Sequence, residues 1–300
     1  MPRTRRRPLS ALLAAGLLAP LGLMLAACAT AAPPTGPDPS ATPVADVDGL
    51  RVEVRQGRFD VPDGVLVVSF ANDGDESVTV SRAEVRSPAL EPGMERTRPF
   101  DLGPGDRLDV RMPLSSSVCD ARPDTTVAVA LRGGAHGDVG ASALLVPSDP
   151  YDTMARIADR DCLAESAAAA AAIVLPERLR VTGSGTDARA VIDVRVEPAA
   201  SGDAAVEIER VLGTTLIGSE SGGAWPIGLE IAAGDPPETV ELPVRPARCD
   251  AHAIADDKRG TILPFELATS DGRAGAVELA SGDALKADLY AYYTERCGLD

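Results

Sequence analysis

A duplicated pattern around two pairs of cysteines constrains the fold of this 300-residue chain more than any other feature. Residues 119–121 and 249–251 both read Cys-Asp-Ala, and each is followed by two apolar runs and a helical pattern that ends at another cysteine. The matching order predicts a duplicated domain of roughly 120 residues per copy, a length at which a chain can bury its own core. We therefore expect two domains of the same architecture, each able to fold alone.

Short alternating segments indicate that each copy is built from β-strands. Residues 50–55, Leu-Arg-Val-Glu-Val-Arg, alternate apolar and charged side chains, as a strand with one buried face does. Further segments with strand character are 65–70, 77–80, 125–131 and 141–146 in the first copy, and 190–196, 205–209, 239–242, 261–267 and 274–279 in the second. About seven short strands per copy is typical of an immunoglobulin-like sandwich, and other small sandwiches or barrels share this pattern.

A helix is expected at the end of each copy. Asp149 and Pro150 offer an N-cap and a proline at the first helical position, and the helix that follows ends at Cys162. In the second copy, apolar residues at helical spacing precede Cys297. The sequence thus predicts a mainly β protein with two tandem immunoglobulin-like β-sandwich domains, each closed by a short C-terminal helix.

The alanine-rich segment 166–172 separates the two copies. Its helix propensity is high, so the first helix can continue through it as a stiff connector, and a flexible hinge is the alternative. The predicted domains are therefore 49–165 and 173–300, with 166–172 as the connector.

The first 27 residues have the features of an export signal. Four arginines within the first seven residues precede an apolar stretch at 9–27, which ends in Leu-Ala-Ala directly before Cys28. This ending resembles the lipobox of bacterial lipoproteins. The resemblance implies that the signal at 1–27 is removed and that Cys28 carries a diacylglycerol anchor, with fatty acids such as palmitate. An uncleaved transmembrane helix is the alternative, but Pro20 interrupts the stretch.

The predicted anchor places the mature chain on the outer face of a cell membrane. Residues 28–48 are rich in alanine and proline and contain almost nothing large to bury, so we expect a disordered tether there. The route of export, general secretory or twin-arginine, stays open.

The cysteines that remain after Cys28 predict two disulfides. Their number is even, and an exported chain meets oxidising conditions. Spacing alone allows three pairings, but the repeat favours pairing within each copy, namely Cys119 with Cys162 and Cys249 with Cys297.

The charge of the mature chain excludes some partners. Without the four arginines of the signal, 25 basic residues face 45 acidic ones, a formal charge of −20. Nucleic acid and anionic lipid headgroups are poor partners for such a surface, so the lipid must anchor the chain without a basic patch. Arginine strongly outnumbers lysine, which indicates a GC-rich genome such as that of an actinobacterium.

Two loops of the second copy are candidate binding sites. Trp225 follows a glycine-rich stretch, and it is either an exposed anchor or a plug at the end of the core. His252, Asp256 and Asp257 lie in one charged loop and could hold a metal, although a solvated loop is the simpler interpretation. His136 lies in a glycine-rich turn and has no counterpart in the second copy.

No catalytic signature is present. The sequence contains no zinc-protease, P-loop or dinucleotide-binding motif. Ser219 and Ser221 flank Glu220, which occupies the central position where a nucleophile elbow requires serine. No functional family is recognised for the mature domains and no cofactor is expected. The hypothesis is a non-enzymatic binding or scaffolding module, whose partner is another envelope protein or a cell-wall component. The alternatives are a carboxylate-based enzyme acting on cell-wall glycan and an extracytoplasmic binder of a metal or small solute.

Overall fold

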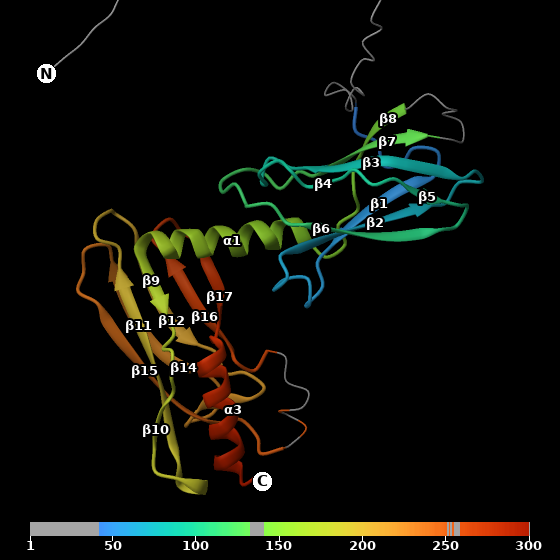
Figure 1. The fold of residues 1–300 in the computed structure, drawn as a ribbon. Coiled ribbons are helices and arrows are strands. Elements are labelled where there is room, and N and C mark those ends of the chain that lie inside the picture. Colours follow the sequence, from blue (N-terminus) through green and yellow to red (C-terminus); the bar gives the residue numbers. More distant parts are fainter. Residues whose placement is uncertain (1–41, 133–140, 251, 253, 255–258, 300) are drawn as a thin grey trace, which may run out of the picture. The chain divides into compact units, whose positions relative to one another are not determined.

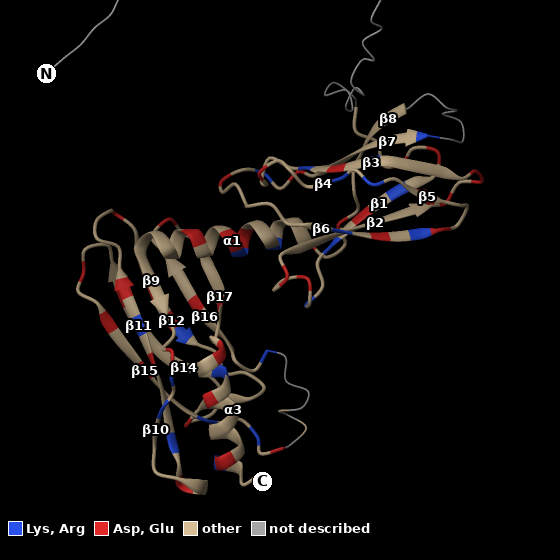
Figure 2. Ribbon diagram, in the orientation of Figure 1, with Lys and Arg blue, Asp and Glu red and all other residues tan. Residues whose placement is uncertain are grey.

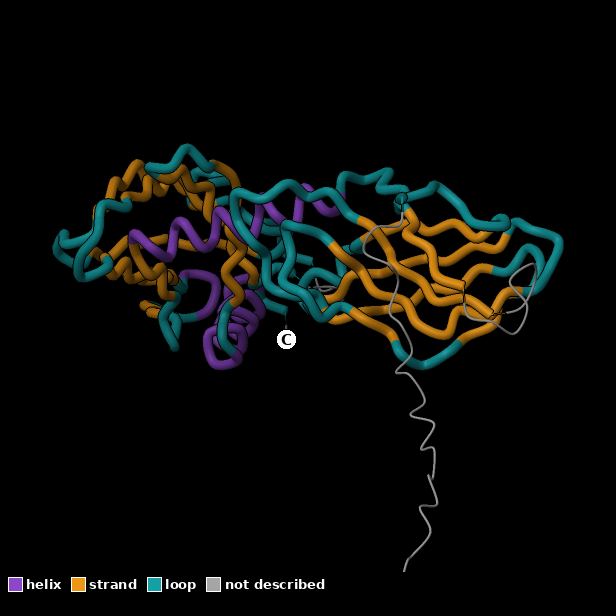
Figure 3. The backbone as a smooth tube through the Cα atoms, turned by 90° about the horizontal axis from the view of Figure 1, so that it is seen from above, coloured by secondary structure: helices purple, strands orange, loops and turns teal. Residues whose placement is uncertain are grey.

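The computed structural model describes residues 42–132, 141–250, 252, 254 and 259–299, and within them the strands gather in two β-sandwiches (Figures 1 and 3). These residues belong to a single compact unit. The predicted signal, Cys28 and most of the predicted tether lie outside the described residues. No helix among the described residues is long and apolar enough to cross a membrane.

The first sandwich has one sheet of three strands and one of five, and all strand pairs are antiparallel. The smaller sheet has the order β1 (Leu50–Arg55), β2 (Val65–Asn72), β6 (Arg107–Pro113). The larger has the order β4 (Glu95–Arg96), β3 (Val78–Arg86), β7 (Thr126–Arg132), β8 (Ala141–Leu145), with β5 (Phe100–Leu102) also paired to β3. Alternate side chains of facing strands, such as Val54, Val68 and Val129, fill the core between the sheets.

The second sandwich repeats this arrangement. One sheet has the order β10 (Arg180–Thr182), β11 (Arg189–Pro198), β15 (Glu238–Pro246), β13 (Ile217–Ser219), with β9 (Ala171–Val174) also paired to β11. The other has the order β14 (Trp225–Ala232), β12 (Ala205–Val211), β16 (Ile262–Thr269), β17 (Ala274–Ala280). The order β14-β12-β16-β17 matches the order β4-β3-β7-β8 of the first sandwich, strand by strand. The predicted fold class, two tandem immunoglobulin-like sandwiches, is therefore confirmed.

Helix α1 (Thr153–Ala170) begins later than the sequence predicts and continues past Cys162 through most of the alanine-rich segment, as the stiff-connector expectation has it rather than the flexible hinge. The carboxylate of Asp149 accepts hydrogen bonds from the backbone N–H groups of Thr153 (2.7 Å) and Met154 (2.9 Å). Asp149 thus satisfies two amides of the first turn, although Asp152, in the left-handed region at φ 50°, is the residue next to the helix. Pro150 lies before the helix rather than at its first position.

The same helix contributes to both cores. Met154 and Ile157 pack in the core of the first sandwich, whereas Leu163, Ala167 and Ala170 pack in that of the second. The helix runs on to Ala170 and passes directly into β9, without a separate linker. The segment expected to connect two independent domains is therefore part of the second domain. The alanines allow this because their small side chains are good helix formers and fit closely against a neighbouring surface.

Helix α3 (Asp283–Cys297) covers the second sandwich. Leu285, Leu289, Tyr292 and Tyr293 are buried in its core. The hydroxyl of Tyr292 donates to the carbonyl of Val244 at 2.9 Å, and burial raises the pKa of this phenol. These tyrosines therefore fix the helix to the sheet rather than form a binding surface.

Both predicted disulfides are present. Cys119 is bonded to Cys162 of α1, and Cys249 is bonded to Cys297 of α3. Each bond joins the segment before the last two strands of a sandwich to the helix that follows them.

Candidate binding groove

Trp225, the first residue of β14, belongs to the core of the second sandwich. Its side chain is only 4% exposed, and its indole N–H donates to the carbonyl of Pro243 at 2.7 Å. Of the two roles left open by the sequence, the structure therefore favours the plug over the exposed anchor.

Replacement of Trp225 by phenylalanine should lower the free energy of unfolding by about 1–3 kcal/mol. The smaller ring leaves a gap and removes the donor to the Pro243 carbonyl. Urea unfolding measures the difference, and Tyr151→Phe, at a tyrosine that is 63% exposed, provides the control. A Trp225→Phe protein as stable as the wild type would contradict this role for the indole.

The second candidate loop is only partly described. His252 is exposed, and its backbone N–H donates to the carboxylate of Asp250 at 2.9 Å. Asp256, Asp257 and His136 lie outside the described residues. Within the described part of the chain, no group of three or more histidine, cysteine or acidic side chains is arranged to hold a metal ion.

Several carboxylates have lowered pKa values for structural reasons. Hydrogen bonds from Ser69 and Arg55 lower the pKa of Asp109, and Arg180 lowers that of Asp193. Arg178 and the amide of Leu179 lower that of Asp288. A glycosidase acid requires a carboxyl whose pKa is raised, so these side chains behave as partners of ion pairs and hydroxyls rather than as general acids.

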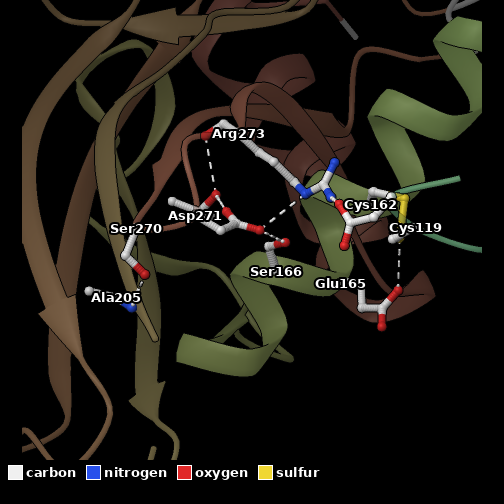
Figure 4. A network of polar contacts seen from close by, with 10 residues as sticks. Cys119, Cys162, Glu165, Ser166, Ala205, Ser270, Asp271 and Arg273 are labelled. Atoms are coloured by element: carbon white, nitrogen blue, oxygen red, sulfur yellow. Dashed lines mark hydrogen bonds and ion pairs between the residues drawn. A yellow bond between two sulfur atoms is a disulfide. The ribbon is translucent and has the colours of Figure 1, made fainter. Parts of the chain in front are cut away.

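A polar network surrounds the turn between β16 and β17 (Figure 4). Asp271 accepts hydrogen bonds from the hydroxyls of Thr269 (2.5 Å) and of Ser166 on α1 (2.7 Å), and these bonds lower its pKa to about 2. Arg273 pairs with Asp271 at 3.1 Å and with Asp120, the neighbour of Cys119. The donors already occupy the Asp271 carboxylate, so this cluster holds α1 against the second sandwich.

A groove of about 1000 Å³ lies on the first sandwich. Its lining comes from the end of β3, the loop at 87–92, residues 124–126 where β7 begins, Val146 directly after β8, and Pro43 before β1. The apolar lining residues are Pro43, Val85, Pro88, Leu90, Pro92 and Val146. Such a volume is at the upper end for small-molecule pockets. The three prolines of the lining have fixed φ angles and no backbone N–H, so the parts of the groove that they form are rigid and poor in hydrogen-bond donors.

The segment before β1 forms one wall of the groove by pairing with an edge strand. The N–H of Val44 donates to the carbonyl of Leu144 (2.9 Å), and the N–H of Val146 donates to the carbonyl of Val44 (2.8 Å). Val44 and Val146 are nonetheless 40% and 47% exposed, so they present apolar surface beside the groove. The sequence assigned Val44 to the tether, but the edge of β8 supplies partners that an isolated segment lacks.

The loop at 87–92 is held in place by backbone hydrogen bonds to residues 116–118. The N–H of Glu91 donates to the carbonyl of Ser116 (2.8 Å), and the N–H of Val118 donates to the carbonyl of Ala89 (2.9 Å). Ala89 and Leu90 are buried, at 1% and 7% exposure. This wall of the groove is therefore attached to residues 116–118.

Residues 116–118 are in turn attached to α1. The hydroxyl of Ser117 donates to the carboxylate of Asp161 at 2.7 Å, and Cys119 is bonded to Cys162, the next residue of the helix. The disulfide thus braces the groove through one short segment.

The charges at the groove are mainly acidic. Arg86 pairs with Glu84 at 2.9 Å, so its charge is already compensated. Glu91 and Asp124 are exposed, and neither forms an ion pair with a basic side chain among the described residues. Elsewhere on the described strands acidic and basic residues are interspersed (Figure 2). The groove therefore combines an apolar floor with two carboxylates that have no cationic partner.

Comparisons with known proteins show no family. No family model and no curated protein matches the chain. Solved structures to which the chain is distantly similar include red sea bream transglutaminase (9% identity, TM-score 0.25, 79% of this chain and 32% of that one). The Salmonella enterica SafA pilin in complex with the SafB chaperone is a second (11% identity, TM-score 0.22, covering 79% of this chain and 98% of that one). The calcium binding domain CBD12 of CALX1.1 is a third (15% identity, TM-score 0.22, covering 75% of this chain and 78% of that one). This chain thus spans about a third of the transglutaminase, and no activity is transferred from any of these proteins.

Proposed function

We propose that this protein is a lipid-anchored lipoprotein of the cell envelope, without enzymatic activity, whose first sandwich binds a polypeptide segment of another envelope protein. The observation that supports binding is the groove, where exposed Val44 and Val146 lie beside a braced, proline-rich wall. The lipobox-like sequence before Cys28 and the two disulfides support an extracytoplasmic location. The carboxylates with lowered pKa values give no support to a general acid.

The lipid anchor predicts that Cys28→Ser abolishes incorporation of a fatty-acid analogue. Without the thiol no thioether to diacylglycerol can form, so an unprocessed precursor or an unlipidated protein accumulates. Metabolic labelling in a lipoprotein-processing bacterium, read on a gel, measures this. Labelling of Cys28→Ser at the wild-type level would show that the anchor lies elsewhere.

Binding in the groove predicts the behaviour of two matched valine variants. Val146→Asp places a charge in the apolar wall, whereas Val181→Asp changes a similarly exposed valine (42%) on β10 of the second sandwich. Cross-linking in the native membrane should recover the same partner with the wild type and Val181→Asp, and should lose it with Val146→Asp. Circular dichroism checks that all three proteins are folded. An unchanged set of cross-linked proteins with Val146→Asp would refute the proposed site.

A further inference from the structure

We infer that the segment held in the groove is an extended, apolar peptide that carries lysine or arginine. This inference rests on the proposed function, and it specifies the chemistry of the partner at the same site. The first argument is the charge of the groove. Burying a segment beside Glu91 and Asp124 leaves two carboxylates facing it, and a cationic side chain compensates them where an anionic one is repelled.

The second argument is the shape of the neighbouring backbone. β8 is the edge strand of its sheet among the described strands, and its outer edge already accepts Val44 in a parallel bridge. The N–H and the carbonyl of Val44 both bond to this edge, so the backbone that forms one side of the groove is itself extended. An extended chain is therefore the conformation that this edge pairs with.

The charge argument also excludes two occupants from the same chain. Residues 28–50 contain no lysine or arginine and include three aspartates, Asp38, Asp46 and Asp48, so the part of the predicted tether that precedes Pro43 offers the groove no cation. A second copy of the mature chain brings a formal charge of −20, and its acidic surface opposes association. The occupant that fits is a basic segment of a different protein.

The test uses the mature chain, residues 28–300 with Cys28→Ser, oxidised and free of lipid. The probes are three fluorescein-labelled decapeptides with the same proline, leucine and valine positions. The peptides differ at two positions only, which are both arginine in the first peptide, both glutamine in the second and both glutamate in the third. Fluorescence anisotropy should give an affinity about tenfold higher for the arginine peptide than for the glutamine peptide, because two exposed ion pairs account for a factor of this order. The glutamate peptide should bind most weakly.

Matched variants locate the charge effect. Glu91→Gln combined with Asp124→Asn should remove the preference for arginine. Glu209→Gln combined with Glu230→Gln changes the net charge equally at two exposed glutamates of the second sandwich, and should leave the preference intact. Added salt should reduce the preference in the wild type.

Two results overturn the inference, and they differ in what they imply for the proposed function. Equal affinity for all three peptides, or a preference that survives in the Glu91/Asp124 variant, refutes the cationic partner. If Val146→Asp still abolishes the native cross-link, binding in the groove stands and only the chemistry is wrong. If Val146→Asp has no effect on the native cross-link, the proposed function fails as well.

Discussion

A fragment that begins at residue 173 should fail to form a cooperatively folded second sandwich, whereas one that begins at Thr153 should fold. The shorter fragment lacks Leu163, Ala167 and Ala170, which are buried in the second core at 3%, 5% and 0% exposure. It also loses the first two residues of β9 and exposes the surface that α1 covers. Loss of several core side chains and a strand exceeds the stability that a domain of this size has in reserve.

The comparison is made by circular dichroism and thermal unfolding of residues 173–300 and 153–300. The longer fragment carries Cys162→Ser, because Cys119 is absent from it. In the intact chain, Leu163→Ala should lower the free energy of unfolding by about 2–5 kcal/mol. Equal, cooperative melting of both fragments would show that α1 is not needed by the second core, and would restore the boundary that the alanine-rich segment suggested.

Removal of the Cys119–Cys162 disulfide should lower the free energy of unfolding by about 4 kcal/mol and also weaken peptide binding. The stability loss follows from the loop that the bond closes, 43 residues in sequence separation, through the entropy of the unfolded chain. The binding loss follows from the structure, because the bond attaches residues 116–118 to α1 and these residues hold the loop at 87–92. The variant is Cys119→Ser combined with Cys162→Ser.

The second disulfide is the matched control. Cys249→Ser combined with Cys297→Ser opens a loop of 48 residues in sequence separation, so its stability loss should be similar. Its effect on the groove should be absent, since neither residue contacts the first sandwich's lining. Urea unfolding and the anisotropy assay separate the two effects. Equal loss of peptide binding in both variants would show that global stability, rather than the local brace, determines affinity.

The parts of the fold that the sequence predicts are those with strong local periodicity. Residues 50–55 and 190–196 alternate cleanly, and both lie in strands. β14 escapes prediction because Pro226 and Gly228 interrupt its pattern. β14 lies at the edge of its sheet, a position where proline is tolerated, and Gly228 adopts a positive φ of 63° beside the register shift between β12 and β14.

The candidate groove could not be predicted in the same way. Its lining comes from five separate parts of the chain, and Pro43, Pro88 and Pro92 individually look like ordinary loop residues. The continuation of α1 through the alanine-rich segment was expected from its helix propensity, but its packing was not. The buried role of Ala167 and Ala170 depends on the neighbouring sandwich, which no local pattern reports.

The pairing of Val44 with the edge of β8 determines which bonds resist a force applied to the N-terminal segment. Force applied before Pro43 is borne first by the two backbone hydrogen bonds that join Val44 to residues 144 and 146. Such bonds contribute only about 1 kcal/mol each, so this segment yields before the sheets do. Because Pro43 lines the groove, its withdrawal also removes part of the wall. If a segment binds there as proposed, tension on the chain and occupancy of the groove oppose each other, and the bound segment raises the force that the attachment withstands.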